Sequence, residues 1–99
     1  MIRHIVLFKL VEFPSVEEKT AKLNEIKLGL EALKDKIEQL KFIEVGINVN
    51  PNETFDLALV TEFDSLADLD IYAKHPDHVA VAKIIGAVKA DRSCVDFEF

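Results

Sequence analysis

The segment Tyr72–His78, with the sequence YAKHPDH, divides the second half of the chain into two short helices. Proline disfavours the helical conformation at the residue before it and is well suited to the first position of a helix. We therefore predict one helix that ends near Lys74 and another that begins at Pro76. His78 then lies in a first helical turn, where the dipole disfavours a positive imidazole and favours a neutral base. The alternative is that Tyr72 is a half-buried helix residue and the histidines only shape the turn.

Length and composition set the class of protein. The 99 residues suffice for one domain, which we predict to span residues 1–99. A formal net charge of −6 argues against a nucleic-acid partner, and no apolar run approaches the roughly 20 residues that span a bilayer. The first residues do not resemble a signal peptide, so we predict a cytoplasmic protein without a membrane partner.

Glycine and cysteine content bear on cofactors. Three glycines leave no phosphate-binding loop and no dinucleotide fingerprint. Cys94 is the single cysteine, so neither an intrachain disulfide nor a cysteine-rich zinc site is expected, and we predict that it is a small core residue. The sequence therefore predicts no cofactor and no metal.

Residues 2–10, with the sequence IRHIVLFKL, form the first predicted strand, and it is apolar on both faces. Ile5 and Leu7 lie on the face opposite to Val6 and its neighbours. A strand covered on one side alternates more cleanly, so we expect both sides of its centre to be covered. His4 is the polar residue among the larger apolar set, where it is either a core histidine or part of a pocket wall.

The remaining elements follow from periodicity and capping. Ser15 and Glu18 fit a capping box, and an apolar stripe at three- and four-residue spacing follows them. We predict helices over residues 16–37, 66–74 and 76–88, and further strands over residues 41–49, 55–63 and 93–99. This order predicts an α+β, ferredoxin-like fold, with a four-stranded antiparallel sheet and helices on one face.

The other face of that sheet predicts a partner. The first and third strands would form its central pair, and both carry apolar residues on the side away from the helices. Soluble proteins seldom expose such a patch, and two sheets packed face to face would cover it. We therefore predict a homodimer in which two sheets form an α/β barrel.

With these residues in hand, the chain resembles the stress-responsive dimeric α/β-barrel (Dabb) family over essentially its full length. The resemblance is carried by IRHIVLFK at residues 2–9, EVGIN at 44–48, FDLALV at 55–60, Phe63, the Tyr72–His78 segment and VDF at 95–97. It implies a homodimer with a cleft between each sheet and its own helices. A stress-related role and a small apolar carbonyl or aromatic ligand are the corresponding expectations.

One plant member of that family, olivetolic acid cyclase, closes a ring by a cofactor-free aldol condensation. By matching motif, its catalytic pair falls on His78 and Asp96, and its cleft positions fall on Tyr72, His4 and His75. The resemblance implies that Asp96 fixes the tautomer of His78, which removes a proton next to a carbonyl. Tyr72 would then donate to the developing enolate oxygen.

The chain departs from the cyclase at one wall of the pocket. The cyclase uses a tyrosine from its first helix there, whereas Tyr72 is the single tyrosine of this chain. We expect Leu23 and Ile26 to occupy that wall, so the same substrate is not implied.

Three hypotheses about function remain open at this point. The first is a small-molecule-binding, stress-related dimer without chemistry, and the second is a cofactor-free lyase or cyclase that uses His78 and Asp96. The third is a metal site on His75 and His78 with Asp77 or Asp96, which has little support because His75 precedes the helix.

Overall fold

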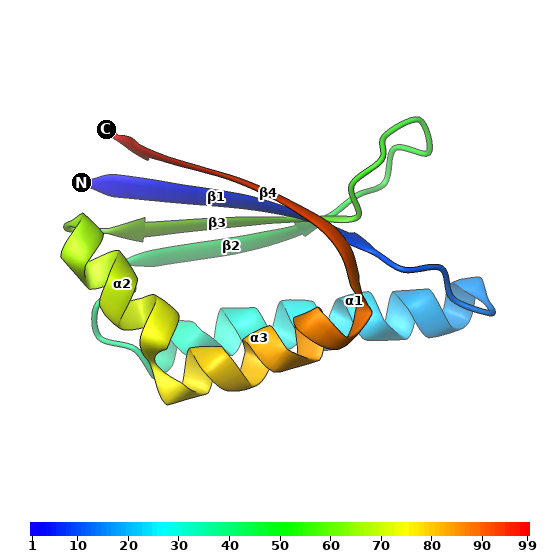
Figure 1. Cartoon of the computed structure of the whole chain (residues 1–99), viewed down its shortest axis with the longest axis horizontal. Helices are drawn as coiled ribbons and strands as arrows, with labels where there is room; N and C mark the ends of the chain where they lie inside the picture. Colours follow the sequence, from blue (N-terminus) through cyan, green and yellow to red (C-terminus); the bar gives the residue numbers. More distant parts are fainter.

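The chain forms one four-stranded antiparallel sheet with all its helices on one face (Figure 1). The structure is a computed structural model that describes residues 1–99. Its elements are β1 (Ile2–Leu10), α1 (Val16–Glu31), the short 3-10 helix η1 (Ala32–Asp35), β2 (Phe42–Ile47), β3 (Leu57–Phe63), α2 (Leu66–Lys74), α3 (Pro76–Val88) and β4 (Lys89–Glu98). The strand order β2-β3-β1-β4 confirms the predicted ferredoxin-like α+β fold.

Caps fix where the helices begin. Ser15 accepts a hydrogen bond from the Glu18 amide at the start of α1, and Ser65 does the same at α2. His75 ends α2 and also caps α3, where its Nδ1 accepts a hydrogen bond of 3.1 Å from the Asp77 amide. Pro76 is the first residue of α3, so the predicted break between two helices is confirmed.

Four elements differ in their bounds from the sequence-based prediction, and one of them is β3, which begins at Leu57 and not at residue 55. The first helix changes at Ala32 to a 3-10 turn, and the Lys36 amide bonds to the Leu33 carbonyl. β2 ends at Ile47 because the Asn48 side chain bonds to the backbone of Asn50 in the following turn. β4 begins at Lys89, directly after α3, because its charged first residues still pair with the end of β1.

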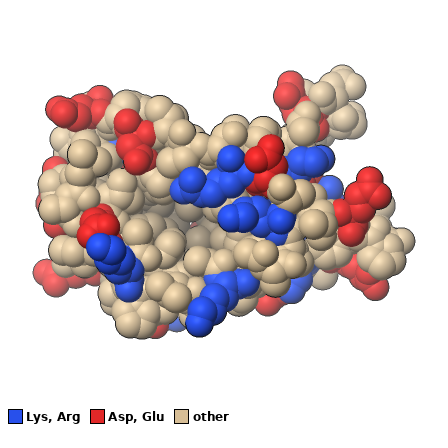
Figure 2. Space-filling model, in the orientation of Figure 1, with Lys and Arg blue, Asp and Glu red and all other residues tan.

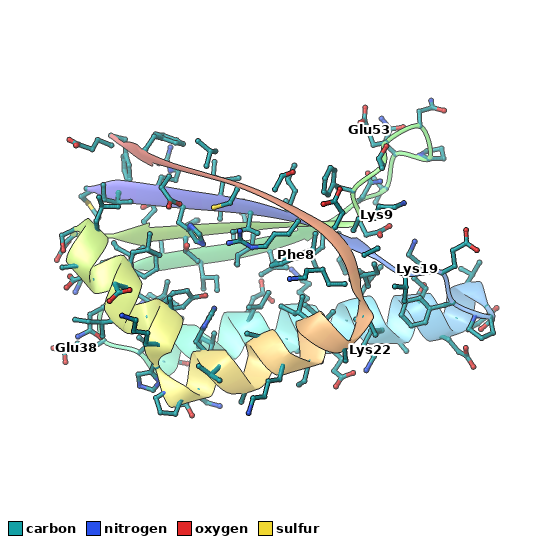
Figure 3. The ribbon with its side chains drawn as sticks, viewed as in Figure 1. Phe8, Lys9, Lys19, Lys22, Glu38 and Glu53 are labelled. Atoms are coloured by element: carbon teal, nitrogen blue, oxygen red, sulfur yellow. The ribbon has the colours of Figure 1, made fainter.

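The core lies between the sheet and the helices. Leu30 of α1 and Phe63 of β3 are both buried there, and Figure 3 shows Phe8 projecting from β1 toward the helices. Near the end of β1, the ammonium of Lys19 lies 2.9 Å from Asp56, whose carboxylate also accepts a hydrogen bond from the Leu10 amide.

No helix combines the length and hydropathy that crossing a membrane requires.

The face of the sheet away from the helices is largely apolar. Ile5 of β1 lies between Val60 of β3 and Val95 of β4 on this face. Arg3 crosses it, paired with Glu62 at 2.9 Å. One chain therefore covers β1 on the helix side only, and the predicted cover on the other side has to come from outside the chain.

Candidate functional site

A cavity of about 370 Å³ lies between the sheet and helices α2 and α3. Its lining includes His4, Val6 and Phe8 of β1, Tyr72 of α2, and His78 and Ile85 of α3. Exposed Lys89 and Arg92 of β4 also border it, and Figure 2 shows basic side chains gathered where α3 meets β4. The cavity is therefore mainly apolar, with a few polar groups inside and cations at one border.

His78 is held in one tautomer by the end of α2. Its Nδ1 lies 3.0 Å from the carbonyl oxygen of Ala73, and a carbonyl only accepts, so Nδ1 carries the proton. Nε2 is then the unprotonated nitrogen; it has no partner in the protein and remains accessible. Burial lowers the pKa of His78, although the hydrogen bond to Ala73 opposes this shift. His78 is thus a neutral imidazole with a free basic nitrogen beside the cavity.

Tyr72 is almost completely buried, with 1% of its surface exposed. Its ring packs between Phe63 and His78, with centroid distances of 5.0 Å and 4.4 Å. The hydroxyl is shielded from water and has no hydrogen-bond partner in the protein. Burial raises the pKa of Tyr72 well above its usual range. Tyr72 is therefore a neutral residue of the cavity wall, with a buried, unpaired hydroxyl and a ring that packs against that of His78.

Asp96 pairs with His4, and not with His78 as the resemblance implied. The two residues lie directly opposite each other on β1 and β4, and the Asp96 carboxylate accepts a hydrogen bond from Nδ1 of His4. No direct hydrogen bond joins His78 and Asp96, because Nδ1 of His78 donates to Ala73 and Asp96 accepts from His4, so the direct form of the predicted pair, which also allowed one bridging water, is wrong. His4 lies in the cavity wall, so of its two predicted environments the structure favours the pocket over the sealed core.

Cys94 lies beside this pair and is exposed, so its predicted place in the core is wrong. Its Sγ is 3.5 Å from Nδ1 of His4 and 3.6 Å from Oδ1 of Asp96. β4 is an edge strand whose residues are all exposed, which an apolar sequence pattern alone does not reveal. Partial burial and the neighbouring Asp96 carboxylate raise the pKa of the Cys94 thiol.

The remaining predicted histidine, His75, lies at the junction of α2 and α3 and does not line the cavity. Its Nδ1 caps α3, while His78 bonds to the backbone of Ala73 and Asp96 bonds to His4. The structure therefore does not bring His75 and His78 together with Asp77 or Asp96 as the hypothetical metal site requires.

Leu23 and Ile26 are core residues and not part of the cavity wall, which corrects their predicted role as ligand contacts. The cavity lies farther along α1, where Leu30 reaches it. The apolar stripe identified the correct face of the helix but not the position along it. Two further lining residues, Leu66 and Leu69, were missed because nothing in their pattern separates a cavity wall from a core position.

The geometry of the site can be set beside known proteins. The sequence pattern of the Stress responsive A/B Barrel Domain, Dabb, matches residues 2–99. The chain belongs to the Dabb family. The resemblance noted from the sequence is thereby confirmed. No protein of curated function matches the chain.

Several solved structures share the architecture of this Dabb domain. A dimeric protein of unknown function and ferredoxin-like fold from Bacteroides fragilis is 51% identical, with a TM-score of 0.94, and the match covers 99% of this chain and 95% of that one. A dimeric ferredoxin-like protein from Thermobifida fusca is 29% identical, with a TM-score of 0.84 and coverage of 99% and 90%. Hydroxynitrile lyase from Passiflora edulis shares the fold at 19% identity, with a TM-score of 0.79 and coverage of 97% and 90%.

Proposed function

We propose that this Dabb domain is a homodimer whose cavity binds a small apolar carbonyl or aromatic compound and acts on it by acid–base chemistry. The apolar outer face around Ile5 and Val60 supports the dimer, since two copies packed face to face would cover it. The description of the 51% identical Bacteroides fragilis protein as dimeric supports the same assembly. Two such sheets would together form an α/β barrel.

The observation that carries the proposal is the unpaired, buried hydroxyl of Tyr72, a residue of the cavity wall whose ring packs against that of His78. A buried hydroxyl without a partner costs about 1–3 kcal/mol of folding free energy. A ligand with a carbonyl oxygen would supply the missing acceptor, and the apolar lining from Phe8 and Ile85 suits the rest of such a molecule. The cavity therefore favours a carbonyl compound over a hydrocarbon.

The same two side chains support a reaction. Nε2 of His78 would take a proton from the carbon next to the carbonyl, so the imidazole becomes an imidazolium while an enolate develops. The Tyr72 hydroxyl would donate a hydrogen bond to the enolate oxygen and stabilise its charge. This is the central step of a cofactor-free, aldol-type lyase or cyclase. Ala73, rather than Asp96, orients the base in this scheme.

Likeness to the Passiflora edulis hydroxynitrile lyase supports only the statement that a protein of this fold can be a lyase. At 19% identity the comparison concerns architecture and carries no statement about the substrate of this chain. The proposal for this chain rests on His78 and Tyr72 alone. Binding without turnover is the competing function, and one experiment separates the two.

The experiment is exchange of protons for deuterium next to the carbonyl of small aryl methyl ketones in D2O, followed by proton NMR. The wild-type protein should accelerate this exchange, and His78→Ala should abolish the acceleration because the base is gone. His75→Asn is the matched control, since asparagine keeps a helix cap and His75 lies outside the cavity. Equal exchange in wild type and His78→Ala would reject the catalytic role. If a ketone raised the melting temperature but no exchange occurred, the protein would bind the ligand without catalysing a reaction.

A further inference from the structure

We propose that His4, Cys94 and Asp96 form a Zn²⁺ site at the exposed edge of the sheet, beside the cavity. The ligand atoms would be Nδ1 of His4, Sγ of Cys94 and a carboxylate oxygen of Asp96, which all lie within 4.8 Å of one another. This inference goes beyond the proposed function and does not depend on it, because neither His78 nor Tyr72 takes part.

The strand register places the three ligands on one face of two paired strands. His4 lies opposite Asp96, and Cys94 lies opposite Val6, two residues along each strand. Alternate residues of a strand point to the same side of the sheet, so all three side chains project from the helix side of the β1–β4 pair. Hydrogen-bonded strands hold their residues at fixed spacing, so the site is largely preorganised.

The distances match the edges of a zinc tetrahedron. With Zn–S of about 2.3 Å and Zn–N or Zn–O of about 2.0–2.1 Å, tetrahedral angles place sulfur about 3.5 Å from nitrogen and from oxygen. Sγ of Cys94 lies 3.5 Å from Nδ1 of His4 and 3.6 Å from Oδ1 of Asp96. Only the His4–Asp96 pair, now in direct hydrogen bond, has to open to admit the ion.

The donor set and its surroundings suit zinc. One thiolate, one imidazole and one carboxylate are ligands that Zn²⁺ accepts, whereas Mg²⁺ and Ca²⁺ take oxygen ligands. Cys94 and Asp96 are exposed on an edge strand, which gives the ion a path of entry. Three protein ligands leave the fourth position to water or to another small ligand.

Binding moves two protons. The Cys94 thiol releases its proton to solvent and becomes the thiolate ligand. The proton of His4 leaves Nδ1, which binds the ion, and the ring is then protonated at Nε2. His4 also lines the cavity, so the ion would convert its free nitrogen from a hydrogen-bond acceptor into a donor. Zinc would thereby alter one polar group of the binding cavity.

The test is titration of the full-length protein with Zn²⁺ and, as a spectroscopic probe, with Co²⁺, in the presence of a phosphine reductant. We expect one ion per chain and a thiolate-to-cobalt charge-transfer band in the near ultraviolet. Cys94→Ala and Asp96→Asn should each weaken Zn²⁺ binding at least tenfold. Glu98→Gln is the matched control, because it removes another carboxylate of β4 outside the cluster and should bind as the wild type does.

The outcomes that overturn the site are equally specific. Wild-type affinity in Cys94→Ala, or a cobalt complex without the charge-transfer band, would show that the ion binds elsewhere. Cys94 is exposed, so Cys94→Ala should keep the metal-free melting temperature of the wild type, which checks that this variant folds. Cys94→Ser provides a second variant, and a charge-transfer band that persists in it would also reject the proposal.

Discussion

Replacing Tyr72 by phenylalanine should make the protein more stable while it weakens ligand binding. The hydroxyl is buried without a partner, and the ring itself packs against Phe63 and His78. Tyr72→Phe keeps that packing and removes only the unpaired group. Removing the desolvation cost should raise the free energy of unfolding by about 1–3 kcal/mol. For a domain of this size the melting temperature then rises by about 4–8 °C for each kcal/mol.

The assay is urea unfolding and calorimetry of both proteins at one fixed protein concentration, because assembly makes stability depend on concentration. Thr61→Val is the matched control. Thr61 is also fully buried, but its hydroxyl donates to the carbonyl of His4 at 3.3 Å. Removing this paired hydroxyl should lower stability by about 0.5–1.5 kcal/mol, so the two substitutions should have opposite signs.

A loss of stability in Tyr72→Phe would refute the reasoning, because it would show that the hydroxyl is satisfied in the folded protein. The ligand assay tests the other half. Tyr72→Phe should reduce the thermal shift that a small aromatic ketone produces, yet leave unchanged the shift from a hydrocarbon of the same shape. Equal reduction for both compounds would mean that the hydroxyl does not recognise the carbonyl.

Three more predictions follow from the structure. Val60→Glu should convert the proposed dimer into a folded monomer in sedimentation, whereas Val49→Glu on an exposed loop should not; a Val60→Glu dimer would contradict the proposed interface. Burial lowers the pKa of His78 from 6.5, so just below that pH the unfolded state binds more protons and stability falls as the pH decreases. His78→Gln should flatten this fall in urea unfolding between about pH 7.5 and about pH 5.5, and a profile parallel to that of the wild type would contradict it. Gly29→Ala should raise stability by about 0.5–1 kcal/mol, since its Cβ meets Val81 at an ordinary 3.6 Å; lower stability in urea unfolding would show that α1 cannot accept the methyl group.

The sequence predicted the fold well because the decisive signals are local. Ser15 and Ser65 mark helix starts through their own side chains, and Pro76 breaks the backbone whatever surrounds it. The apolar residues at both parities of β1 also indicated an apolar outer face, because side-chain direction in a strand needs no tertiary information. These features depend on residues within a few positions of each other.

The site was harder to predict because it depends on long-range register. Asp96 meets His4 through the pairing of the two ends of the chain, and no local pattern specifies that alignment. The motif resemblance implied that His78 and Asp96 form a pair. It could not show that Nδ1 of His78 donates its hydrogen bond to the backbone carbonyl of Ala73 instead. Cys94 was misplaced for a related reason, since its exposure depends on β4 being an edge strand.

The one-residue joint at His75 has a consequence for how this fold can diversify. Tyr72 precedes the joint and His78 follows it, so the donor and the base keep their relative position as long as the capped break remains. Side chains farther from the joint, such as Leu66 and Ile85, shape the rest of the cavity. Substitutions there can change which molecules fit without moving Tyr72 relative to His78. If the proposed function holds, residues that select the substrate are thus separate from residues that react, and new specificities can arise by substitution at the far ends of two helices.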